Sequence, residues 1–359
     1  MGAPACPALL EWLDDHAAGL DDGHADPAVL LPRLGDAGMF GIGVPAEFGG
    51  QGGDVTDAVE AIAAVSARSL AAGFVFWSQR SFIEYLLQSP NAALRGRLMP
   101  ALLRGGVAGA TGLSNAMKAL AGLEPLQIVA APENEGYRLG GRMPWVTNLR
   151  AEGFHVAAAI AHSDGSGALV ASLPHDAPGL RRSEDLSLLG LRGTSTAAID
   201  LRAVPLAPAD IIHPDAATWL PQVRPAFLGL QCGMSIGLAR RSVQEAADQG
   251  GAAREVLRQP VLLLRQRLAA EEASLREGLR AQAFQTRAAP LFELRIRLAG
   301  LVAEAVGLEL QASGGRAYLQ PHGEGFARRW REAAFIPVIT PSLVQLKAAL
   351  AARPGAVAA

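Results

Sequence analysis

Tyr137–Asn148, with the sequence YRLGGRMPWVTN, is a strand-like run that turns through Gly140 and Gly141 and delivers an indole and a hydroxyl close together. Alternate side chains of an extended strand point to the same face, so Trp145 and Thr147 are expected to lie side by side. The stretch belongs to a longer series of short apolar runs separated by turn residues. This pattern predicts β-structure in the middle of the chain.

An indole beside a hydroxyl suits a flat, redox-active ring. The indole of Trp145 can cover one face of an isoalloxazine, and the hydroxyl of Thr147 can reach a polar edge of the same ring. We therefore hypothesise that both residues contact a flavin. On this stretch alone, the alternative that Trp145 is an ordinary half-buried strand aromatic stays open.

The composition limits the class of protein. The chain has 359 residues, half of them hydrophobic, which is enough for two or three packed units. A net charge of -2 without a clustered basic face argues against nucleic acid or an anionic membrane as the main partner. Cys6 and Cys232 fit no disulfide scaffold and no zinc motif. Because no apolar run approaches the ~20 residues that span a bilayer and the N-terminus has no secretory pattern, the sequence predicts a soluble, cytoplasmic protein.

Helices are expected on both sides of the β-rich region. Residues 1–105 include DAVEAIAAVSARSLAAGFVFW, which is predicted to be a long Ala-rich helix. Residues 106–215 have turns at the spacing of an antiparallel barrel or sandwich. Residues 216–359 return to long amphipathic segments, including helices at about 291–313 and about 340–352, and favour a four-helix bundle.

Five motifs in this order resemble the acyl-CoA dehydrogenase superfamily. They lie within residues 35–347 and are GMFGIGVPAEFGGQGGD, WVTN, GLRGTSTAAIDLRAVPL, REVLRQPV at 254–261 and QASGG at 311–315. In REVLRQPV, Leu257 and Arg258 stand where the family has phenylalanine and glycine. Taken alone, Arg254 could be a solvated charge at a helix end and QASGG a helix C-cap.

The resemblance implies an α+β flavoprotein with three domains: a helical domain at 1–105, an antiparallel β-barrel or sandwich at 106–215 and a four-helix bundle at 216–359. FAD would lie between the last two domains, and the subunits would form a homodimer or homotetramer because QASGG meets the FAD of a neighbouring subunit. Arg254 offers a fork for a pyrophosphate, and the glycine pair lets the backbone approach the cofactor. The cofactor-binding residues that the resemblance implies are Leu113, Ser114, Trp145, Thr147, Arg254, Gln311, Gly314, Gly315 and Ser342.

The implied activity is oxidation of the CH–CH group of an acyl-CoA or related acyl thioester, with an electron-transferring flavoprotein or a flavin reductase as redox partner. Dehydrogenases of the family remove the α-proton with a glutamate. Counting from Arg331 places Thr340 at that position, and Ala226 stands where a minority of the family carries the base. Threonine is no base at neutral pH. Glu324 and Glu332 are the nearby carboxylates, but no catalytic residue can be named.

Three alternatives remain. The superfamily also contains flavin-dependent monooxygenases and oxidases, which do not need this glutamate, and the fold could persist as a catalytically degenerate scaffold. From another class, GMSIG at 233–237 matches the nucleophile turn of serine hydrolases, although the apolar spacing around Ser235 predicts that this residue lies inside a helix.

The segment DDHAAGLDDGHAD near the N-terminus clusters acidic residues and histidines, which are common metal ligands. Its two histidines lack the i, i+4 spacing of helical ligands, so we interpret the segment as a solvated helix end and turn and predict no metal.

Overall fold

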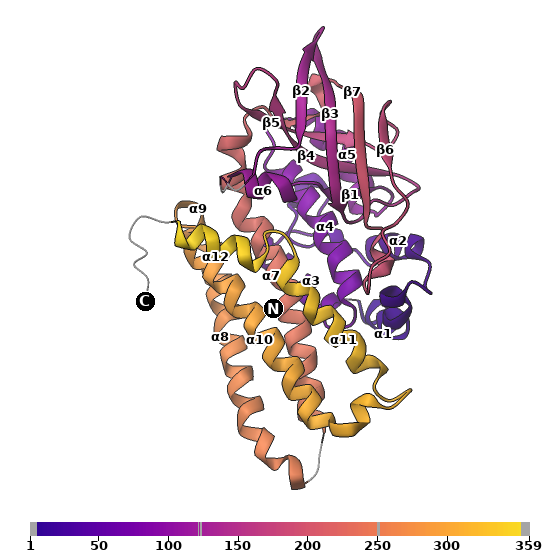
Figure 1. Ribbon diagram of the computed structural model, residues 1–359, viewed down its shortest axis with the longest axis vertical. Coiled ribbons are helices and arrows are strands. Elements are labelled where there is room, and N and C mark those ends of the chain that lie inside the picture. The colour runs from indigo at the N-terminus through magenta and orange to yellow at the C-terminus, as the bar shows by residue number, and fades with distance from the viewer. Residues whose placement is uncertain (1–5, 121, 123, 250–251, 353–359) are drawn as a thin grey trace.

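The computed structural model has a helical part at each end of the chain and a β-sheet between them (Figure 1). It describes residues 6–120, 122, 124–249 and 252–352; of residues 120 and 252–254 it describes the backbone alone. The order of helices, sheet and helices confirms the predicted fold class.

From residue 6 on, where the described part of the chain begins, five helices precede the sheet. The segment predicted as one long helix is two helices, because the hydroxyl of Ser69 accepts the Ala72 N–H at 3.3 Å and so starts a new helix. The helix before it begins at a capping box formed by Asp54 and Asp57. The helices are α1 (Pro7–Asp22), α2 (Leu30–Asp36), α3 (Val55–Ser66), α4 (Leu70–Leu87) and α5 (Ala92–Leu103), with 3-10 turns η1 (Pro27–Val29), η2 (Met39–Gly41) and η3 (Ala46–Phe48) between them.

The described residues in the middle of the chain form one eight-stranded sheet. Its strands follow the order β6-β7-β3-β2-β4-β5-β8, and β1 pairs with β4. The sheet is mixed and not wholly antiparallel, since β1 and β2 both run parallel to β4. The elements are β1 (Ala108–Thr111), α6 (Ser114–Leu120), β2 (Ile128–Glu133), β3 (Gly136–Val146), β4 (Phe154–His162), β5 (Ala168–Pro174), β6 (Leu180–Arg182), η4 (Arg192–Thr194), β7 (Ala197–Leu206), η5 (Pro208–Asp210) and β8 (Ile211–His213).

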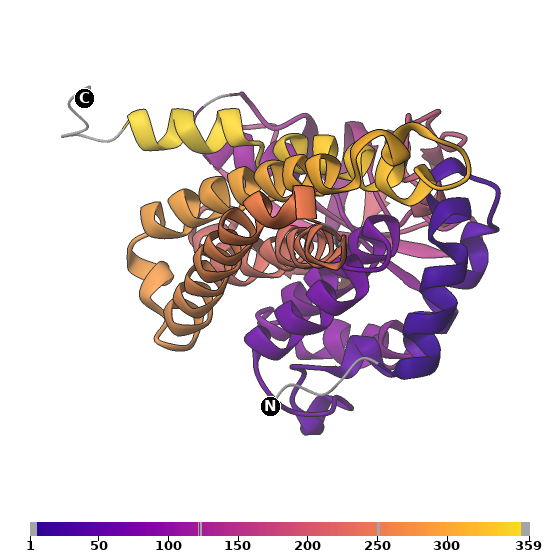
Figure 2. The same ribbon diagram turned by 90° about the horizontal axis from the view of Figure 1, so that it is seen from below.

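The C-terminal part is a helical bundle built around one long central helix. Figure 2 shows this helix, α7, between the N-terminal helices and the rest of the bundle, and it packs against α3, α4, α8 and α10. The elements are α7 (Ala216–Asp248), η6 (Ala252–Leu257), α8 (Arg258–Arg280), α9 (Ala283–Thr286), α10 (Ala289–Ser313), η7 (Gly314–Tyr318), α11 (Glu324–Phe335), η8 (Ile336–Val338) and α12 (Leu343–Ala351).

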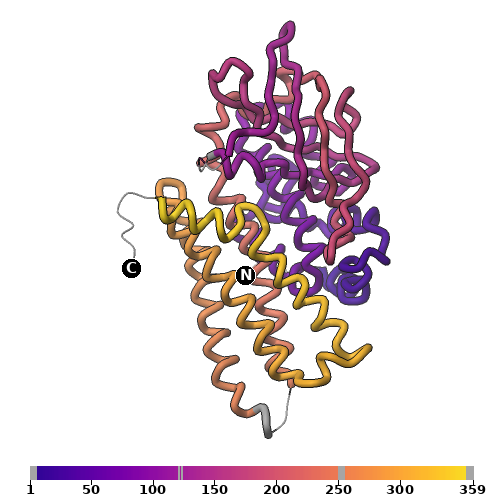
Figure 3. Tube along the Cα trace, in the orientation of Figure 1, coloured from indigo at the N-terminus to yellow at the C-terminus, as the bar shows by residue number. Residues whose placement is uncertain are grey.

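Helix α11 was not predicted from the sequence, because its buried face carries charges. Arg328, Arg329 and Glu332 are buried on it and form ion pairs, so charged residues stand where apolar residues usually mark the buried face of a helix. By hydropathy, Glu324–Ala351 is long and apolar enough to cross a membrane. In the structure this stretch is divided into α11, η8 and α12, and the trace turns between the two helices (Figure 3).

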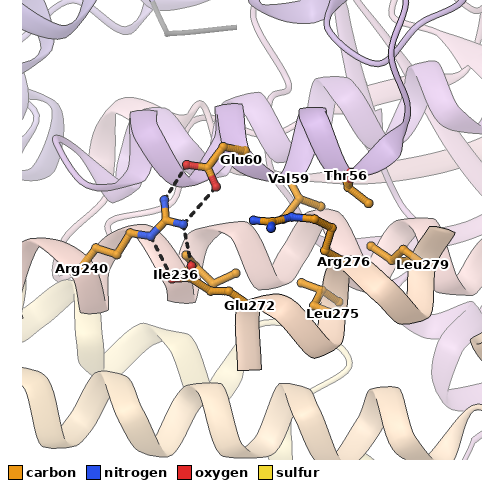
Figure 4. A pocket seen from close by; sticks show the side chains of 9 residues that line it. All are labelled: Thr56, Val59, Glu60, Ile236, Arg240, Glu272, Leu275, Arg276 and Leu279. Atoms are coloured by element: carbon orange, nitrogen blue, oxygen red, sulfur yellow. Dashed lines mark hydrogen bonds and ion pairs between the residues drawn. The ribbon is translucent and has the colours of Figure 1, made fainter. Parts of the chain in front are cut away.

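An ion-pair network of three residues connects the N-terminal helices to the bundle (Figure 4). Arg240 on α7 donates to both oxygens of Glu60 on α3, at 2.6 and 3.0 Å, and to both oxygens of Glu272 on α8, at 2.9 and 2.7 Å. Such forked pairs fix geometry as well as charge, so this contact sets how the three helices face one another.

Close approach between α3 and α7 depends on a glycine. A Cβ at Gly237 would lie 2.2 Å from the carbonyl oxygen of Ala63 and 2.9 Å from the backbone nitrogen of Ala67. Gly300 on α10 is also inside a helix, but a Cβ there would meet nothing within 4 Å.

We therefore expect Gly237→Ala to lower the free energy of unfolding by about 3 kcal/mol, because backbone atoms of α3 cannot move aside cheaply. The matched variant Gly300→Ala should raise the free energy of unfolding by roughly 0.5–1 kcal/mol, as alanine does in an exposed helix interior. Urea unfolding measures both, and equal effects at the two positions would contradict the close packing of α3 and α7.

Candidate functional site

A cavity of about 1010 Å³ lies where the sheet, the N-terminal helices and the C-terminal segment meet. Its walls come from α4, from α6, from the end of β3, from the loop at 186–191 with η4, and from residues 331–345. A space of this size is at the upper end of the range for sites that bind small molecules and cofactors. Four of the residues predicted to bind a cofactor line it: Ser114, Trp145, Thr147 and Ser342.

Trp145 and Thr147 reach the cavity from the end of one strand. Strand β3 ends at Val146, and its pairing with β7 shifts register between Met143 and Val146. Such an irregularity redirects side chains, and here it brings both residues to one wall. The indole of Trp145 lies in the cavity wall and is 64% exposed, so the protein covers only a part of its surface.

The hydroxyl of Thr147 heads a chain of hydrogen bonds. It is 2.9 Å from the Thr196 hydroxyl, which is 2.8 Å from the Thr194 hydroxyl, and the last donates to the Leu191 carbonyl oxygen at 2.8 Å. Each hydroxyl has one proton, so in this arrangement Thr196 donates to Thr194 and Thr147 donates to Thr196. Thr147 accepts in none of these hydrogen bonds, so its hydroxyl oxygen is available as an acceptor in the cavity wall.

The other predicted contacts differ in where they lie. Leu113 is fully buried between two residues of the wall, and the Ser342 hydroxyl caps α12 by accepting the Gln345 N–H at 3.4 Å. Gln311, Gly314 and Gly315 are exposed at the end of α10 and the start of η7, outside the cavity.

The role predicted for these three residues in a neighbouring subunit stays a prediction. Arg254 falls in η6, and its side chain lies outside the described residues.

Glu124 is the single carboxylate among the described residues that line the cavity. Its oxygen accepts from Asn115 at 2.9 Å and pairs with Lys118 at 3.0 Å. These hydrogen bonds, first that of Asn115 and then that of Lys118, lower the pKa of Glu124. An acid that is held ionised by its neighbours is a weak base, so Glu124 is poorly suited to remove a proton from carbon.

The position at which the family resemblance places a base carries a hydroxyl. Thr340 lines the cavity, and its carbonyl oxygen accepts from Gln231 at 3.0 Å. Glu332 is fully buried away from the cavity wall, where it accepts from the Leu70 N–H at 3.0 Å and burial raises its pKa. Glu324 is exposed at the start of α11. Neither carboxylate lines the cavity.

Ser235 lies in the middle of α7 and is fully buried, as the apolar spacing predicts. A serine hydrolase needs its nucleophile on a sharp turn between a strand and a helix, and this residue has no such turn. Within the described part of the chain, no three His, Cys, Asp or Glu side chains gather as a metal site would require.

Asp21 is a functional residue that sequence reasoning missed. The acidic segment at the end of α1 was expected to be solvated, but Asp21 is 1% exposed. Its carboxylate accepts the Leu191 N–H at 2.9 Å and two N–H groups of Arg331 at 2.6 and 3.0 Å. Leu191 and Arg331 both line the cavity, so one carboxylate joins α1, the cavity loop and α11. Its place on the apolar face of α1, four residues after Ala17 and eight after Leu13, is the signal that could have identified it.

Removing this carboxylate should loosen the cavity wall. We expect Asp21→Ala to lower the free energy of unfolding by about 2–4 kcal/mol, because it leaves the Leu191 N–H unpaired and Arg331 without its buried counter-charge. Asp22→Ala changes the neighbouring, more exposed carboxylate and should shift the free energy of unfolding by less than ~0.5 kcal/mol. Chemical denaturation compares the two variants, and an effect of Asp21→Ala no larger than that of its neighbour would refute the role of the junction.

The comparisons with known proteins agree with one another on the fold. The family model described as acyl-CoA dehydrogenase, N-terminal domain, matches residues 9–106. Benzylmalonyl-CoA dehydrogenase of Aromatoleum aromaticum is 28% identical over 190 residues, which cover 53% of this chain and 50% of that protein. The chain thus spans about half the length of the curated relatives that it matches.

Solved structures resemble the whole chain. A glutaryl-coenzyme A dehydrogenase in complex with glutaryl-CoA superposes with a TM-score of 0.79 at 18% identity, covering 95% of this chain and 92% of that one. The prolyl acyl carrier protein oxidase AnaB superposes with a TM-score of 0.78 at 17% identity, covering 96% and 97%. At these identities the likeness concerns the fold.

Proposed function

We propose that this chain is a member of the acyl-CoA dehydrogenase superfamily that binds FAD in the cavity and oxidises the CH–CH group of an acyl-CoA or related acyl thioester. The observation that carries the proposal is that Trp145 and Thr147 bring a largely exposed indole and a hydroxyl to the wall of a cavity of about 1010 Å³. Bound FAD supplies a two-electron acceptor.

The chain's own residues fit such an occupant. Trp145 would cover one ring face, and Thr147 would accept a hydrogen bond from the ring edge while Thr196 keeps its hydroxyl oriented. Phe74, Trp77 and Phe335 line the cavity as well and would exclude water from the space beside the ring. Ser114 and Ser342 lie at other parts of the wall and would contact polar groups of the cofactor.

Assembly and redox partner follow the same proposal. Gln311, Gly314 and Gly315 are exposed and would contact the FAD of a neighbouring subunit in a homodimer or homotetramer. An electron-transferring flavoprotein would take the electrons from a dehydrogenase, whereas a flavin reductase would supply them to a monooxygenase.

The proposed contact between Trp145 and FAD is tested by removing the indole. Trp145→Ala should weaken FAD binding about tenfold, since the ring loses ~1.4 kcal/mol of stacking. Trp330→Ala removes a half-exposed indole on α11 that does not line the cavity, and it should leave binding unchanged. Titration of the apoprotein with FAD, followed by quenching of flavin fluorescence, measures both. Equal affinities in the two variants would exclude Trp145 from the flavin site, and a colourless wild-type protein that resists added FAD would favour a scaffold.

A flavin-dependent oxidase or monooxygenase is the second candidate, and a specific observation favours it. The single described carboxylate of the cavity wall is held in an ion pair, and Thr340 occupies the expected position of the base. A monooxygenase, in which reduced flavin and oxygen form the oxidant, would not require a base at that position. The two candidates therefore differ in whether a thioester reduces the bound flavin or oxygen reoxidises it quickly.

Restoring a carboxylate distinguishes them. If the fold is a dehydrogenase that lost its base, Thr340→Glu should speed anaerobic bleaching of the flavin by acyl-CoA thioesters by about 100-fold, a typical contribution of a positioned base. Thr340→Gln has nearly the same shape without the charge and should match the wild type. Stopped-flow absorbance follows the reaction. Rapid bleaching of the wild type would refute the loss of the base, and slow bleaching of all three with fast reoxidation by air would favour the oxygen-using candidate.

A further inference from the structure

Arg295 on α10 is a fully buried guanidinium next to the cavity wall. Its Nε donates to the side-chain oxygen of Gln231 at 2.9 Å, and its Nη2 donates to the Ile336 carbonyl oxygen at 2.7 Å. Its Nη1 is buried without a hydrogen-bond partner. Burial lowers the pKa of this group, but an arginine remains charged at neutral pH.

Arg295 differs from the other buried arginines that the structure describes. Arg80 pairs with Glu84 at 2.9 Å, Arg328 with Glu332 at 2.7 Å and Arg329 with Glu309 at 2.5 Å. No carboxylate in the described part of the chain lies within ion-pair distance of Arg295, whose two partners are both neutral oxygens. Burying a charge without a counter-charge costs several kcal/mol. Because this burial lowers the stability of the fold, we expect the cation to have a role that offsets the cost.

The guanidinium is connected to the cavity through one short segment. It holds Ile336 directly, and Gln231, its other partner, donates to the Thr340 carbonyl oxygen at 3.0 Å. Both ends of segment 336–340 are therefore fixed by one linked pair of side chains. Val338, Ile339 and Thr340 of this segment line the cavity. An occupant that rests against them would contact the segment that the buried cation holds.

We propose that Arg295 is a positioning residue that holds segment 336–340 and whose unneutralised charge stabilises negative charge in the cavity, so that it favours the reduced state of a bound flavin. This inference rests on the proposed function. Two electrons and one proton added to an oxidised flavin give the ring a net charge of -1, and a cation behind a water-poor wall is screened less than one at the surface.

The test is the reduction potential of the bound flavin, measured by equilibrium titration with dithionite against a reference dye. Arg295→Met removes the charge and keeps the apolar stem. We expect a tenfold shift of the equilibrium toward oxidised flavin, which is about -30 mV for a two-electron couple. Arg295→Lys keeps the charge and should stay near the wild-type potential. A merely structural role would alter stability in both variants without moving the potential.

A matched control removes a buried arginine together with its carboxylate partner, so that the net charge of the protein does not change. In Arg329→Met combined with Glu309→Gln, a buried ion pair is replaced by neutral side chains, so the potential should not change although the stability does. If this double variant lowers the potential as much as Arg295→Met, the effect is a general consequence of loosening the bundle, and the proposal is wrong.

If Arg295→Met does not fold, variants of its partner test the same charge. Gln231→Glu places an anion beside the Nε of Arg295 and neutralises it, while Gln231→Leu loses the same hydrogen bond to Thr340 without adding charge. We expect the potential of the first to lie below that of the second by about the same tenfold shift in equilibrium. Equal potentials would overturn the role of Arg295 while leaving the proposed function intact. Failure of the wild type to bind any flavin would instead overturn the proposed function, and this inference with it.

Discussion

The cavity depends on one buried carboxylate. Asp21 at the end of α1 accepts hydrogen bonds from a backbone N–H of the sheet part and from a guanidinium of α11. These three pieces lie far apart in the sequence, and each brings its own section of the wall. Because a buried acceptor without partners is costly, the pieces are stable together only in this arrangement. A residue that does not line the cavity therefore joins two sections of its wall to the N-terminal helices.

Much of the fold follows from local patterns. Periodic apolar residues gave the long helices α7, α8 and α10, and short runs between turns gave the strands. Two features could not be predicted from the sequence, because they depend on contacts between distant parts of the chain. Helix α11 buries ion pairs where a pattern of apolar residues was sought. The parallel pairing of β1 and β2 with β4 depends on long-range neighbours that no local run of residues encodes.

The residues of the candidate site also fall into two groups, those that the sequence predicts and those that only the folded structure reveals. Ser114, Trp145, Thr147 and Ser342 belong to short motifs, and the structure brings them to one cavity although 228 positions separate the first from the last in the printed numbering. Asp21 and Arg295 belong to no motif. Their importance comes from partners 170 and 64 residues away, which are visible only once the chain is folded. Sequence patterns thus identified side chains that face an occupant and missed those that hold the wall in place.

The charges around the cavity constrain its chemistry. The carboxylate of Glu124 is already engaged by Lys118, and Thr340, another residue of the cavity wall, offers a hydroxyl that cannot take a proton from carbon. Behind that wall, Arg295 lacks a counter-charge. A wall with a cation and without a free base favours the transfer of electrons to a bound cofactor more than the removal of a proton from a bound substrate. Such an environment suits a substrate whose proton is already acidic, or an oxidant generated inside the cavity. An unactivated carbon acid would require a base that the described wall does not contain.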